Sequence, residues 1–237
     1  MNADKTILQA AKDRVKIARI ESRAKSGGSK TLSSKASIGS LTPFVSASGT
    51  TWLLVYCLKI PRRKDDSPFE VFVPSDSKEM RSLNSPLGVL ILGSPSGLLN
   101  SALWDVALTK FIEIVRGSSK TPSREIVLIS DNLGIHRQPE SIKKALKRDC
   151  FQLFLPPNTS HFTQPLDNIL FAGLKQRISK LSVEHFDASL FWSVRNREVR
   201  EIVLEATLEA FPQIFTVSNI KEAWKNVGIA PFNKKCL

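Results

Sequence analysis

The chain has 237 residues, of which 42 % are hydrophobic and 24 % are charged, a balance that suits a globular protein with one good core. No apolar run approaches the about 18 residues that a membrane-spanning helix needs, and the N-terminus lacks the apolar stretch of a signal peptide. The three cysteines are far apart and form no CxxC pair, so neither a zinc ribbon nor a disulfide framework is predicted. We expect a soluble, intracellular protein.

The formal net charge of +12 is a strong excess for a chain of this size. Such a charge favours a polyanionic partner, usually nucleic acid, and a nuclear location fits it. A solvated basic surface without a partner is the alternative that composition leaves open.

The first third of the chain predicts a basic loop followed by two strands. Residues 22–39 are rich in Ser, Gly and Lys and are expected to form a mobile basic loop. Apolar runs predict strands at 41–47 and 51–60, joined by a tight turn at 48–50. Residues 61–86 are charged and rich in Pro and Ser, which predicts a surface loop.

The rest of the chain alternates short apolar runs with amphipathic stretches, and residues after 182 are mostly helical in pattern. This order predicts an α/β fold whose later strands lie parallel, joined by helical crossovers. We expect a core at 1–181 and a helical extension of the same domain at 182–237. The predicted strands are 88–93, 126–130 and 151–155, and the predicted helices are 98–115, 138–148 and 165–181.

Three acidic residues occupy positions that would suit a metal site. Asp131 ends a predicted strand, Asp167 begins a predicted helix, and Asp4 follows the short first segment. Carboxylates that face one another in a poorly solvated pocket repel unless a cation lies between them. Mg²⁺ and Mn²⁺ prefer oxygen ligands, and two such ions promote phosphodiester cleavage.

Each acid also has a simpler explanation. Asp4 could be an exposed residue near the chain start, and Asp131 could cap the turn that contains Gly134. Asp167 could favour the positive end of its own helix. The residues alone leave a metal site and these local roles open.

Two segments carry a more specific signal. The first is Asp131-Asn132-Leu133-Gly134-Ile135-His136, and the second is Leu155-Pro156-Pro157-Asn158-Thr159-Ser160-His161, followed by Gln164-Pro165-Leu166-Asp167. Together they closely resemble the catalytic core of pogo/Tigger-type transposases, which are DDE endonucleases of the Tc1/mariner superfamily. Asn2-Ala3-Asp4-Lys5-Thr6 is similar to the first-acid motif of that family, usually Asn-x-Asp-Glu-Thr. The tail around Gly228-Ile229-Ala230-Pro231-Phe232 is similar to its closing segment.

The resemblance implies an RNase H-like mixed sheet flanked by helices, with Asp4, Asp131 and Asp167 binding two Mg²⁺ or Mn²⁺ ions. It implies DNA cleavage by water and then strand transfer by the freed 3′-hydroxyl. The residues expected to support the metal ligands or shape the loops are Asn132, His136, His161 and Gln164. For the two histidines, local hydrogen bonding in a loop stays open.

The excess of basic residues identifies candidate contacts to the DNA backbone. We expect DNA as the partner, and a homodimer is a candidate assembly. The candidate residues are Lys143, Lys144, Lys147 and Arg148 on the predicted helix 138–148, with Lys175 on the next helix.

Two features depart from the family pattern. The chain begins three residues before Asp4, so the first strand is expected to be truncated, and Lys5 replaces the usual Glu. Two hypotheses therefore remain: an active metal-dependent DNA endonuclease or transposase core, and a catalytically inactive, domesticated or relic DNA-binding protein.

Overall fold

The computed structural model describes residues 2–3, 6–9, 37–60, 69–74, 88–117, 125–157, 159–184, 196–234 and 236. The strands are β1 Asn2–Ala3, β2 Thr6–Gln9, β3 Ser37–Val45, β4 Thr51–Lys59, β5 Phe69–Pro74, β6 Gly88–Ser94, β7 Ile126–Ser130 and β8 Cys150–Phe154. The helices are α1 Ser101–Gly117, α2 Pro139–Leu146, α3 Ser160–Thr163, α4 Phe171–Glu184, α5 Asn196–Ile214 and α6 Val217–Asn226, and a π-helical turn, η1, spans Leu166–Leu170.

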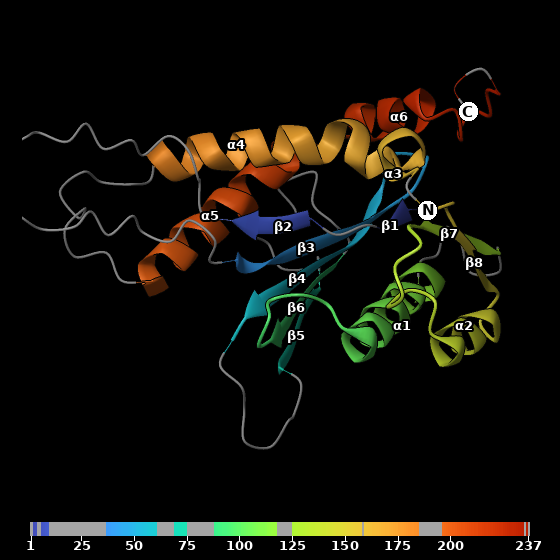
Figure 1. The fold of residues 1–237 in the computed structure, drawn as a ribbon, viewed down its shortest axis with the longest axis horizontal. Helices are drawn as coiled ribbons and strands as arrows, with labels where there is room; N and C mark the ends of the chain where they lie inside the picture. Colours follow the sequence, from blue (N-terminus) through green and yellow to red (C-terminus); the bar gives the residue numbers. More distant parts are fainter. Residues whose placement is uncertain are drawn as a thin grey trace, which may run out of the picture.

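The strands form one mixed sheet in the order β5-β6-β4-β3-β1-β7-β8, and β2 also pairs with β3. β1 pairs with β3 in antiparallel fashion and with β7 in parallel fashion, so these two residues join the two halves of the sheet. β8 continues the sheet parallel to β7. Helices flank the sheet on both sides (Figure 1). The predicted RNase H-like mixed α/β fold is confirmed.

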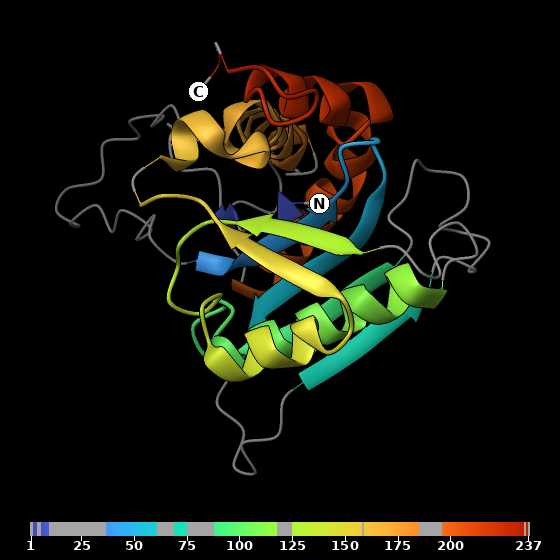
Figure 2. The same ribbon diagram turned by 90° about the vertical axis from the view of Figure 1, so that its right-hand side faces the viewer.

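Alternation along the strands creates a separate core on each face of the sheet. In β4, Leu53, Val55 and Cys57 pack with the α1 side, whereas Leu54 and Tyr56 pack with the opposite side. The second core contains residues of α4, α5 and α6, so the C-terminal helices share a hydrophobic core with the sheet. Figure 2 shows α1 and α2 along one face and α4 and α6 over the other.

Helix α1 begins where Asn100 caps its first turn. The Asn100 Oδ1 atom accepts a hydrogen bond of 2.9 Å from the Leu103 N–H, as an N-cap side chain does. Val106 and Ile114 of α1 are only partly buried. The residues that α1 buries fully are Leu103, Trp104, Ala107, Leu108, Phe111, Ile112 and Val115.

Two predicted loops are shorter than expected. Ser37–Gly39, placed in the mobile loop 22–39, belong to β3, and the remainder of that loop lies outside the described residues. The predicted loop 61–86 contains strand β5, which pairs with β6 through Phe69–Pro74. This edge strand was not predicted because the residues on both sides of it are polar and rich in Pro. Its register is fixed by pairing with β6 rather than by its own sequence pattern.

The turn predicted at 48–50 is confirmed. The Gly49 N–H donates to the Ser46 carbonyl at 3.0 Å, and Gly49 adopts a φ of 95°, a conformation that glycine allows without steric cost.

The helix predicted at 165–181 begins instead as the π-helical turn η1 and continues as α4. Ile169 is exposed, although a regular helix would place it on the same side as Leu166, whereas Leu166, Leu170 and Leu174 are buried. A π turn adds a residue per turn and so rotates the apolar face, which a regular 3.6-residue pattern does not anticipate.

Candidate active site

Asp131 follows the last residue of β7, at the carboxyl end of a strand inside the sheet. The Asp131 side chain is 15 % exposed. Its Oδ1 atom accepts a hydrogen bond of 3.3 Å from the Leu133 N–H, which closes a turn of the kind expected of Asp. Both the turn and the strand end predicted for Asp131 are therefore present.

His136 lies against the same carboxylate. Its Nδ1 atom is 2.6 Å from the Asp131 Oδ1 atom, and its side chain is only 1 % exposed. The imidazole ring packs on the Trp104 indole of α1, with ring centroids 4.1 Å apart. The fold thus brings two of the predicted site residues together and links them to the α1 core.

Asp167 lies in the first turn of η1 and is exposed. Its neighbour Leu166 belongs to the same hydrophobic cluster that packs against Ile129, two residues before Asp131. Leu166 and Ile129 thus share the core cluster on the α4 side of the sheet, whereas the His136 ring beside Asp131 packs on Trp104 of the α1-side core.

The other predicted loop residues differ in burial. Gln164 is fully buried, and its amide atoms have no hydrogen-bond partner among the described residues. Asn132 is half-buried. His161 belongs to α3, and its side chain lies outside the described residues.

Asp4 and Lys5 lie outside the described residues. Their neighbour Ala3 pairs with Ser130, the residue before Asp131, in the parallel β1–β7 ladder. Within the described residues, no group of three or more His, Cys, Asp or Glu side chains is placed to hold a metal ion.

Residues 77–227, more than half of the chain, match the family model of the DDE superfamily endonucleases. This chain belongs to the DDE superfamily endonuclease family. The matched range contains Asp131, Asp167 and the segment between them, whereas Asp4 lies before it. Membership indicates a transposase-like nuclease domain, and nucleases of this superfamily generally use divalent metal ions and act on DNA.

One curated relative is similar to part of this endonuclease-family chain. It is a protein named MFS-type transporter clz9 from Cochliobolus lunatus, with 28 % identity over 124 residues. The match covers 52 % of this chain and 13 % of that protein, so the chain spans only a small part of the relative. In the described part of the present chain, every helix is too short or too polar to cross a membrane.

The side chains present fit the divalent ions that a DDE endonuclease would use. Oxygen is the donor that Mg²⁺ and Mn²⁺ prefer, and Asp131 and Asp167 supply carboxylate oxygens. Asp131 uses Oδ1 for Leu133 and His136, which leaves its Oδ2 atom without a protein partner among the described residues. The exposed Asp167 carboxylate is accessible from solvent.

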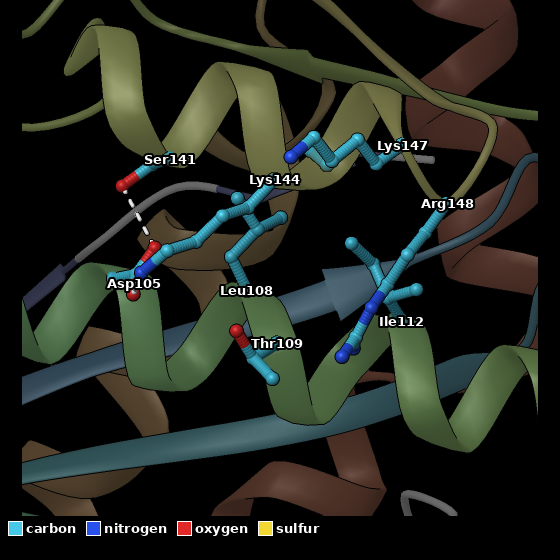
Figure 3. A pocket seen from close by; sticks show the side chains of 9 residues that line it. Asp105, Leu108, Thr109, Ile112, Ser141, Lys144, Lys147 and Arg148 are labelled. Atoms are coloured by element: carbon cyan, nitrogen blue, oxygen red, sulfur yellow. Dashed lines mark hydrogen bonds and ion pairs between the residues drawn. The ribbon is translucent and has the colours of Figure 1, made fainter.

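The helix predicted at 138–148 ends at Leu146, so Lys147 and Arg148 follow α2 and are not part of it. The basic residues in and just after α2 divide into two kinds, as Figure 3 illustrates for the groove between α1 and α2. Lys144 is paired, because its Nζ atom lies 2.6 Å from the Asp105 Oδ2 atom of α1. Ser141 donates a hydrogen bond of 3.0 Å to the other Asp105 oxygen. Lys147 and Arg148 line the same groove, of about 230 Å³, and neither has an acidic partner within the described part of the chain.

The remaining two basic candidates are exposed. Lys143 lies 3.5 Å from the Glu140 carboxylate one turn earlier on α2, and Lys175 is exposed on α4. Exposed i,i+3 pairs contribute little, so Lys143 keeps most of its freedom to contact an anion.

The buried cysteines behave as core residues. Burial raises the pKa of the Cys150 thiol to about 11, so it stays protonated near neutral pH and is a poor metal ligand. Cys57 is buried in the same α1-side core.

Two residues of α1 were not predicted from the sequence: Trp104, which packs against His136, and Asp105, which pairs with Lys144. Both belong to one helical turn, and only their contacts with α2 and the preceding loop reveal their roles.

Proposed function

We propose that this chain is the catalytic core of a pogo/Tigger-type DNA transposase, which cleaves phosphodiester bonds and then transfers strands. The observation that carries the proposal is the placement of Asp131 at the carboxyl end of β7, with a buried histidine on one carboxylate oxygen. Sites in sheets with parallel strands gather at such ends. A nuclear location, suggested by the basic composition, belongs to the same proposal.

Asp4, Asp131 and Asp167 would hold two Mg²⁺ or Mn²⁺ ions. When bound, these ions would supply activation of a water or 3′-hydroxyl and stabilisation of the leaving oxygen. The chain itself contributes the positions of the carboxylates: Asp131 from the end of a strand, Asp167 from the π-helical turn. Gln164, buried beside that turn with an unpartnered amide, would shape the loop that carries Asp167.

The DNA backbone would be held by basic residues in and just after α2 and on α4. Lys147 and Arg148 are the strongest candidates, because no carboxylate of the described residues neutralises them. Lys143 and Lys175 would add exposed charge, whereas Lys144 is engaged with Asp105. Contacts of this kind position DNA without reading its sequence.

An inactive DNA-binding protein is the second candidate. It is favoured by Lys5, because a cation next to Asp4 in the sequence would compete with metal ions for the carboxylate. A homodimer is compatible with either candidate.

Nicking of supercoiled plasmid separates the two candidates. The wild type, Asp131→Asn and the control Glu140→Gln are compared with Mg²⁺, with Mn²⁺ and with a chelator. The two substitutions remove the same charge, but Glu140 lies on the exposed surface of α2. We expect metal-dependent nicking by the wild type and Glu140→Gln, and its loss in Asp131→Asn.

Two results would contradict the nuclease. DNA binding without nicking by the folded wild type would favour the inactive candidate. Equal nicking by Asp131→Asn would show that the activity does not come from this site.

A further inference from the structure

We infer that His136 is a positioning residue for Asp131: held against Trp104, it fixes the carboxylate so that the Oδ2 atom is directed to a bound cation. The inference rests on the proposed function, because it assumes that Asp131 is a metal ligand. It goes further by assigning His136 and Trp104 a task in holding that ligand.

The burial of His136 needs an explanation. A polar ring that is 1 % exposed loses its contacts with water, which is costly unless a protein group replaces them. Among the described residues, neither ring nitrogen has an aligned hydrogen-bond partner, but Nδ1 lies at ion-pair distance, 2.6 Å, from the Asp131 carboxylate. We therefore assign the Asp131 carboxylate as the polar partner of the buried His136 ring.

Trp104 determines where the imidazole lies. Its indole is buried in the α1-side core, with Phe44 stacked on it at a centroid distance of 5.7 Å. The His136 ring rests on this indole, with an interplanar angle of 41°. A series of contacts thus leads from the core to the carboxylate: Phe44 packs on Trp104, Trp104 on His136, and His136 lies against Asp131. Packing in the core therefore sets the position of the proposed metal ligand.

The consequence for Asp131 is a division between its two oxygens. Oδ1 is engaged by the Leu133 N–H and approached by the His136 Nδ1 atom, whereas Oδ2 has no protein partner among the described residues. The Nδ1 contact is at ion-pair distance, but the ring N–H is not aligned as a hydrogen bond requires. Poorly aligned contacts at catalytic sites commonly become aligned hydrogen bonds when the site is loaded. Groups that orient a metal ligand in this way raise metal affinity.

Two substitutions separate the nitrogen of His136 from its ring. His136→Phe keeps an aromatic ring against Trp104 but removes Nδ1, whereas His136→Asn loses the ring and keeps an N–H donor near the same place. The measurement is Mn²⁺ binding to the full chain by electron paramagnetic resonance, with Glu140→Gln as the surface control and Asp131→Asn as the ligand control.

We expect Mn²⁺ binding to weaken about 10–100-fold in His136→Phe and to stay within about threefold of the wild type in His136→Asn. Unchanged binding in His136→Phe would overturn the inference, and so would an Asn variant as weak as the Phe variant, since the ring alone would then matter. If Asp131→Asn binds Mn²⁺ as well as the wild type, the proposed metal site fails as well.

A measurement on the unaltered chain covers the case in which a variant does not fold. In long-range ¹H–¹⁵N spectra of ¹⁵N-histidine-labelled protein, we expect His136 to carry its proton on Nδ1 and to shift when Mg²⁺ is added. A proton on Nε2 alone, or signals that Mg²⁺ leaves unchanged, would overturn the inference, because Nδ1 would then not donate to Asp131.

Discussion

Asp131 and Asp167 are the same residue type and are both predicted metal ligands, yet the fold supports them differently. Asp131 follows a strand inside the sheet, is 15 % exposed and is contacted by a buried histidine. Asp167 lies exposed on a π-helical turn that is held to the sheet through Leu166 and Leu170. One acid is placed by the core, and the other by an irregular helical turn packed on it.

In the proposed metal site, the two acids would have different tasks. A ligand fixed by core packing defines where a cation would bind, while a ligand on an exposed turn can approach it. π-Helical turns are frequent at functional sites because they re-aim side chains without ending the helix.

The largest expected effect is a break in the core that supports Asp131. Trp104→Ala should lower the free energy of unfolding by about 3–5 kcal/mol, because it removes a fully buried indole from between Phe44 and His136. Urea denaturation measures the loss. Phe211→Ala, in the core of the opposite face, is the matched control and should cost a similar amount. A loss below about 1 kcal/mol for Trp104→Ala would contradict its role as a core anchor.

The contrast between the two acids should itself be measurable as stability. Asp131→Ala leaves the buried His136 ring without its polar contact, so we expect a loss of about 1–3 kcal/mol in the absence of metal. Asp167→Ala changes an exposed side chain and should cost less than about 1 kcal/mol. Chemical denaturation of both variants in chelator tests this, and equal losses would remove the distinction drawn above.

The smallest expected effect concerns DNA binding at the C-terminal end of α2. Lys147→Ala should reduce the slope of log K against log salt concentration by about one, since one phosphate contact is lost. Lys144→Ala should change that slope less, because Lys144 is already paired with Asp105 at 2.6 Å. Fluorescence anisotropy with a labelled duplex at several salt concentrations measures both variants. A larger change for Lys144→Ala would show that the Asp105 pair opens on binding.

Most of the sheet could be predicted from the sequence. The apolar run before Asp131 predicts β7 with its observed bounds, and the β3–β4 hairpin follows from two β-branched runs around Gly49. These elements are local: their patterning and turn chemistry agree with the final structure. β5 was missed, because an edge strand between polar flanks takes its pairing from β6.

The site shows the same distinction between features encoded locally and features that depend on tertiary contacts. Sequence alone determined that Asp131 ends a strand and that Asp167 begins a helical segment. The reason is that an apolar run, a turn and a helix start are each encoded by residues close together in the sequence. Only the tertiary structure decided that His136 would be buried beside Asp131, that Trp104 would support it, and that Lys144 rather than Lys147 would be paired. The physical reason is that these contacts join α1 to the segments after β7, and no pattern within either segment encodes which faces will meet.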